Sequence, residues 1–205
     1  MIRFGSGTLQ LGALILMTLF LEPCSAKTGT LDEPHAILVE GDVVGTHDPS
    51  IIKEGDVWYL FATTPPNLKT GEQFPVRCSK DLVHWKACGH VFSETPAWIK
   101  QESPKTKELW APDISYFDGK FHLYYAYSLF GVNTSGIALL TNRTLDPQSP
   151  DFGWVDEGLV LRSRAEDDFN AIDPNLILDE GGQAWLSFGS FLERNQDAQA
   201  RSENR

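Results

Sequence analysis

A unit that recurs every 62 or 63 residues limits most strongly how this chain can fold. Each copy has a proline, a short apolar strand, a glycine turn and then a strand dense in aromatic and apolar residues. The prolines are Pro49, Pro112 and Pro174. The aromatic strands are expected at Val57–Ala62, Phe121–Tyr127 and Ala184–Phe188. Because no long segment of helical periodicity competes with them, the sequence predicts an all-β protein built from about three similar units.

A repeat of this length, with a hairpin and outer strands, is typical of a β-propeller blade with long loops. A β-sandwich with a coincidental period is the alternative architecture. In a propeller the innermost strands converge on a central channel, so the residues beside their first prolines lie around one mouth. Those residues are Asp48, Asp113 and Asp173.

Asp48 and Asp173 occupy the same place in their repeats, each directly before the proline. An Asp-Pro pair taken alone is an ordinary turn opener. Two such carboxylates in register at one mouth can also shift each other's pKa, so that one acts as a base while another stays protonated. Glycoside hydrolysis uses such a set of carboxylates. Asp113 follows its proline, and it is either a third rim carboxylate or a residue that caps a turn.

Charge and the N-terminal segment restrict the partners and the compartment. Seventeen Lys and Arg against 28 Asp and Glu give a net charge of -11, so the chain repels phosphate backbones and no nucleic-acid partner is expected. The N-terminal segment predicts a secretory signal peptide over residues 1–26. It has a basic residue, Arg3, then the apolar run Leu11–Leu21 and the ending Pro23–Ala26. A buried N-terminal helix is the alternative. With the signal removed, we expect an extracellular or periplasmic protein without a membrane anchor.

Removal of the signal peptide, which contains Cys24, leaves Cys78 and Cys88 in an oxidising compartment. They are ten positions apart across a predicted hairpin, which favours a disulfide between them. Two buried thiols are the alternative, because a disulfide needs Cα atoms within about 7 Å.

Several motifs in the same order resemble glycoside hydrolase family 43. They are His47–Ile51, Ser79–Trp85, Leu109–Asp113 and Asn170–Asn175. Further segments are similar to its arabinan endo-1,5-α-L-arabinanases in particular, namely Thr144–Pro147, Phe152–Asp156 and Trp185–Phe191. The resemblance implies a five-bladed β-propeller, of which about three blades are present in this chain. It also implies an inverting glycosidase that cleaves α-1,5-L-arabinofuranosidic bonds in arabinan, a side chain of pectin. We expect the protein to be a monomer.

The same resemblance implies roles for individual residues. Asp48 matches the general base that activates water, and Asp173 matches the carboxylate that orients the general acid and tunes its pKa. Positions that match the family's substrate cleft are Asn170, Ala171, Ile172, Gly131, Ser190 and Phe191. For Gly131, a simple turn glycine is the alternative.

The motifs stop near Phe191, which limits the expected activity. The resemblance places the family's general acid, a Glu, and the His ligand of its channel Ca²⁺ in later blades, so no cofactor is assigned to this chain. Glu193 is the nearest carboxylate but matches no motif. We therefore expect a partial propeller domain over 27–191, a polar, disordered tail over 192–205, and a truncated or frame-shifted product. The alternative function is an inactive remnant or a carbohydrate-binding module that lacks the general acid.

Overall fold

The computed structural model describes residues 38–66 and 71–189. The predicted signal peptide and polar tail lie outside these ranges. Within them the chain forms eleven strands and one six-residue helix, so the predicted all-β class is confirmed. No helix in these ranges is long and apolar enough to cross a membrane.

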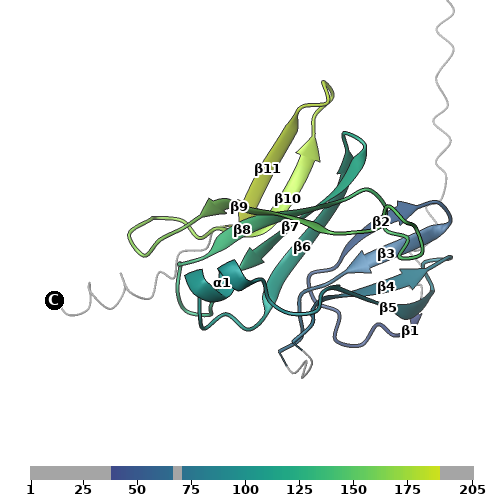
Figure 1. The fold of residues 1–205 in the computed structure, drawn as a ribbon, viewed down its shortest axis with the longest axis horizontal. Coiled ribbons are helices and arrows are strands. Elements are labelled where there is room, and N and C mark those ends of the chain that lie inside the picture. The colour runs from purple at the N-terminus through teal and green to yellow at the C-terminus, as the bar shows by residue number, and fades with distance from the viewer. Residues whose placement is uncertain (1–37, 67–70, 190–205) are drawn as a thin grey trace, which may run out of the picture. The chain divides into compact units, whose positions relative to one another are not determined.

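Blade 1 is a five-stranded sheet with the order β1-β5-β4-β3-β2 (Figure 1). Its strands are β1 (Glu40–Gly41), β2 (Ser50–Glu54), β3 (Val57–Phe61), β4 (Gln73–Ser79) and β5 (His84–Phe92). Strands β2 to β5 form an antiparallel meander, whereas β1 pairs with β5 in parallel. A side chain on Gly41 would collide with the backbone carbonyl of Trp85, so the close approach of β1 requires glycine there.

Blade 2 is a four-stranded antiparallel sheet with the order β6-β7-β8-β9. Its strands are β6 (Leu109–Phe117), β7 (Lys120–Tyr127), β8 (Gly136–Asn142) and β9 (Val155–Arg162). Helix α1 (Ala97–Glu102) precedes β6. An antiparallel hairpin follows blade 2, with β10 (Ile172–Leu178) and β11 (Ala184–Gly189). The described chain therefore contains two complete blades and the inner hairpin of a third.

The main core lies where blade 1 packs against blade 2. Phe61 and Phe74 of blade 1 are 1% and 0% exposed, and Tyr125 of β7 is also 0% exposed. The rings of Phe74 and Tyr125 meet edge to face with centroids 5.2 Å apart. Because burying one such side chain contributes about 1.5–3 kcal/mol, this core fixes blade 2 beside blade 1.

The three prolines of the repeat follow residues with left-handed backbone. The φ angles are 47° at Asp48, 41° at Ala111 and 51° at Asp173. In β6 and β10 the pairing shifts register around this place, as in a β-bulge. The residue that matches Asp48 in blade 2 is therefore Ala111. Our expectation that each proline precedes its inner strand holds only for blade 1, because the bulge lets a residue without an N–H group lie inside β6 and β10.

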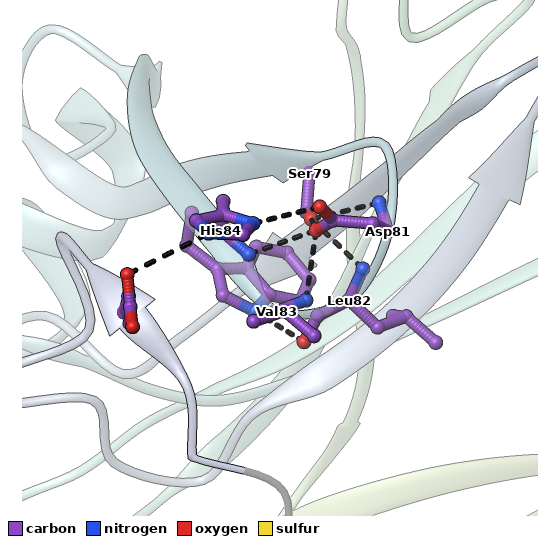
Figure 2. Close-up of polar contacts among 7 residues, drawn as sticks. Ser79, Asp81, Leu82, Val83 and His84 are labelled. Carbon is purple, nitrogen blue, oxygen red and sulfur yellow. Dashed lines mark hydrogen bonds and ion pairs between the residues drawn. The ribbon is translucent and has the colours of Figure 1, made fainter.

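The β4–β5 connection is stabilised by side chains of its own turn (Figure 2). Asp81 accepts backbone hydrogen bonds from Val83 and His84, and Ser79 accepts one from Leu82. The ring of His84 lies 2.7 Å from the Asp81 carboxylate and 3.5 Å from Glu40 of β1. These bonds lower the pKa of Asp81, and the two carboxylates raise the pKa of His84. The turn therefore serves the fold, as Asx and Ser turns do.

Cys78 of β4 and Cys88 of β5 form a disulfide across this hairpin. Their Cα atoms are 5.9 Å apart.

Candidate active site at the inner ends of the blades

Asp48 and Asp173 lie directly before the prolines of two different blades: Asp48 is two residues before β2, and Asp173 is the second residue of β10. The negative charge of Asp48 acts on Asp173. Strands β2 and β10 both pack against β6 (Figure 1). The fold thus brings together two carboxylates that are 125 positions apart in the sequence.

Asp48 is held by hydrogen bonds on one of its oxygens. Oδ2 accepts a hydrogen bond of 2.7 Å from the hydroxyl of Thr63, and it lies 2.7 Å from Nδ1 of His47. The side chain is 40% exposed, so the carboxylate remains open to solvent. A carboxylate that is both oriented and open to water suits a general base.

Asp173 has different surroundings. Partial burial raises the pKa of its carboxyl, the charge of Asp48 raises it further, and His47 acts in the opposite sense. Gly189 of β11 lies against this side chain, because a Cβ there would be 3.1 Å from Oδ2 of Asp173. Asp173 thus holds its proton to a higher pH than an isolated aspartate does.

Hydrogen bonds between neighbouring blades fix the inner strands that carry Asp48 and Asp173 relative to each other. Oγ of Ser50 accepts a bond of 3.1 Å from the backbone N–H of Ile114. One blade further on, Oδ2 of Asp113 accepts a bond of 2.7 Å from the N–H of Leu176, and Oδ1 accepts one of 3.2 Å from Asn175. Asp113 therefore neither stands in the ring of residues before the prolines nor caps its own turn. It fastens blade 2 to the third blade.

The predicted substrate residues before Asp173 are buried. Asn170, Ala171 and Ile172 are 3%, 0% and 2% exposed. The amide oxygen of Asn170 accepts a bond of 2.6 Å from the hydroxyl of Ser135, and Ser163 binds the N–H of Ala171 at 3.0 Å. These contacts position the chain that leads to Asp173. Whether the three residues also touch substrate stays a prediction.

Gly131 lies in the turn between β7 and β8 with φ 78°, which fits the turn-glycine alternative. Beside it, Phe130 is 92% exposed and its ring lies 4.9 Å from that of Trp110 in β6. Phe130 and the half-buried Trp110 form an aromatic pair whose faces could stack on a sugar ring. The role of Gly131 in binding stays a prediction, and Ser190, Phe191 and Glu193 lie outside the described residues.

The resemblance places the His ligand of a channel Ca²⁺ in a later blade. Across 38–66 and 71–189, no three His, Cys, Asp or Glu side chains gather closely enough to hold a metal ion, and no step is assigned to a metal.

The family model for family 43 of the glycosyl hydrolases matches residues 43–202. The chain belongs to glycosyl hydrolase family 43. Solved structures of this family also match its fold. An endo-arabinanase from Bacillus licheniformis gives a TM-score of 0.68 at 43% identity, over 76% of this chain and 51% of that one. The arabinanase of Cellvibrio cellulosa complexed with arabinohexaose gives 0.65 at 45% identity, over 71% and 45%. The family's β-propeller is thus the fold of the described blades, and the sandwich alternative is set aside.

Two curated relatives have names that refer to α-(1→5)-linked L-arabinose. The extracellular exo-α-(1→5)-L-arabinofuranosidase ArbA of Cellvibrio japonicus is 47% identical over 150 residues, which are 72% of this chain and 41% of the relative. The extracellular endo-α-(1→5)-L-arabinanase 1 of Bacillus subtilis is 41% identical over 146 residues, 71% and 43%. The chain therefore spans less than half the length of these relatives.

Sequence reasoning missed Thr63 and the serines around Asn170. Thr63 lies outside every motif, and only its distance from Asp48 in space marks it. Ser135 and Ser163 lie in separate loops of blade 2, and no local pattern links them to Asn170. Only the folded blades bring these groups together.

Proposed function

We propose that this chain acts as an inverting glycoside hydrolase on α-1,5-linked arabinan, with Asp48 as general base and Asp173 as the carboxylate that tunes the acid. The observation that carries the proposal is the pair itself: two carboxylates at equivalent places and in electrostatic contact, of which Asp48 accepts a hydrogen bond from Thr63 and Asp173 has a raised pKa. Relatives named as acting on α-1,5-linked arabinose supply the substrate class, and their description as extracellular supports secretion.

In the proposed reaction, Asp48 takes a proton from water as its oxygen attacks the anomeric carbon. The bond to the leaving sugar breaks on the opposite face, and that sugar's oxygen takes a proton from a general acid. Asp173, with its raised pKa and its place beside Asp48, is suited to influence that acid's proton. The general acid itself is not assigned to a described residue.

The test is reducing-sugar release from linear arabinan by the purified full chain and its Asp48→Asn variant. We expect the variant to lose about 10²–10⁴ in rate, because a general base contributes that much. Asp151→Asn is the matched control, since Asp151 is an exposed aspartate in the loop before β9. Equal rates for the parent and Asp48→Asn would remove Asp48 as the base. A folded parent that binds arabino-oligosaccharides but releases no sugar would favour the carbohydrate-binding alternative.

A further inference from the structure

We propose that Thr63 is a positioning residue for Asp48, through which blade 2 orients the base in blade 1. The proposal rests on the proposed role of Asp48. Thr63 follows β3 by two residues and is half-buried. Its hydroxyl donates to Oδ2 of Asp48 at 2.7 Å and accepts from the backbone N–H of Ala111 at 2.8 Å.

The direction of these bonds follows from the chemistry of the groups. A backbone N–H can only donate, so Ala111 occupies an acceptor site of the Thr63 oxygen. An ionised carboxylate can only accept, so the hydroxyl proton points to Asp48. Such a bond fixes the orientation of the Asp48 carboxylate, which a general base needs.

The contact also selects which carboxylate oxygen faces the water. Oδ2 is occupied by Thr63 and His47. In the described part of the chain, no hydrogen bond reaches Oδ1 of Asp48. Oδ1 is therefore the oxygen available to the attacking water, and Thr63 fixes its direction.

Thr63 is itself held from both blades. Its N–H donates to the carbonyl of His47 at 3.0 Å, and the N–H of its neighbour Thr64 donates to the carbonyl of Leu109 in β6 at 3.0 Å. The buried side chain of Gln73 accepts from the N–H of Leu109 at 3.0 Å. These bonds fix β6 beside the end of β3, so the distance from Ala111 to Thr63 depends on blade packing.

The experiment compares Thr63→Val with Thr63→Ser in the full chain. For Thr63→Val we expect about a tenfold loss of kcat with KM unchanged, because the base loses its fixed direction while the substrate contacts remain. Serine keeps the hydroxyl and restores kcat. Thr141→Val is the matched control, because the Thr141 hydroxyl also donates to a carboxylate, Glu157, at 2.7 Å, away from Asp48. We expect its kcat and KM to match those of the parent.

A second readout separates this proposal from the proposed function. The NMR chemical shift of the Asp48 carboxyl carbon at fixed pH reports the hydrogen bond from Thr63 whether or not the chain hydrolyses arabinan. A chemical shift that changes in Thr63→Val but not in Thr63→Ser or Thr141→Val supports the proposal, and an unchanged chemical shift in Thr63→Val overturns it. If Thr63→Val does not fold, the same measurement on Thr63→Ala decides. A parent without hydrolysis would count against the proposed function alone.

Discussion

Asp48 and Asp173 occupy one backbone position in two blades, yet their surroundings differ. Asp48 receives a hydroxyl on one oxygen and leaves the other side of its carboxylate to solvent. Asp173 has Gly189 of β11 against its side chain, and its pKa is raised. The difference shows that a repeat can place two chemically identical groups at one backbone position while their neighbours in space differ.

The largest effect is expected when variants of the two carboxylates are compared on two substrates that differ in the leaving group. We expect Asp48→Asn to slow linear arabinan and para-nitrophenyl α-L-arabinofuranoside alike, by about 10²–10⁴, because both need the base. We expect Asp173→Asn to slow arabinan strongly but the aryl substrate by less than about tenfold. A nitrophenolate leaves without a proton, so it does not need the acid that Asp173 tunes.

The measurement is kcat/KM of the full chain on each substrate. Asp151→Asn should match the parent on both. Equal losses on the two substrates in Asp173→Asn would show that Asp173 acts on the water side with Asp48, and the distinction between the two carboxylates would fail.

A smaller effect is expected where the blades that carry the two carboxylates are fastened together. Asp113→Ala leaves the N–H of Leu176 without its charged acceptor and should cost about 2 kcal/mol of unfolding free energy. Ser50→Ala removes a neutral acceptor from Ile114 and should cost about 1 kcal/mol. Urea unfolding measures both. Asp113→Asn keeps an oxygen for Leu176 and should lie between Asp113→Ala and the parent; a loss as large as that of Asp113→Ala would contradict this account.

The smallest expected effect concerns the pKa of Asp173. Asp48→Asn removes a negative charge and should lower that pKa, although burial, the larger cause, keeps it above the ordinary value. His47→Gln removes the group that lowers it, and the pKa should rise. NMR titration of the Asp173 carboxyl measures both shifts. If neither variant moves the titration, the two carboxylates are not in electrostatic contact.

The raised pKa of Asp173 also predicts how the stability of the fold changes with pH. Because the folded-state pKa of Asp173 is raised, its contribution to stability is complete below the unfolded-state pKa and is lost as the pH rises through the folded-state pKa. The Tm of Asp173→Asn relative to the parent should therefore be higher at pH 7 than at pH 3.

Much of the fold could be predicted from local pattern. The glycine turns and aromatic strands placed the hairpins β2–β3, β6–β7 and β10–β11, because turn chemistry and strand patterning are local. The start of the inner strands could not be predicted in the same way. Whether Pro112 lies before a strand or inside a bulge depends on pairing with β7, which is not encoded next to the proline.

The candidate site also has features that the sequence predicted and features that it did not. The sequence placed Asp48 and Asp173 in register, because the repeat carries each to the same backbone position. It misplaced Asp113 as a rim or turn residue, because its partners Asn175 and Leu176 lie in the next blade. The burial of Asn170 also depends on serines from another part of the chain.

By itself, then, the sequence determined an all-β repeat, its family and the two carboxylates, since these follow from residue type and spacing. Only the tertiary structure decided that Thr63 binds one carboxylate, that Gly189 lies against the other, and that Asp113 joins two blades. The physical reason is that proton affinity and orientation depend on burial and on hydrogen-bond partners. Those partners come from strands far apart in the chain, and packing alone brings them within 3 Å or so of each other.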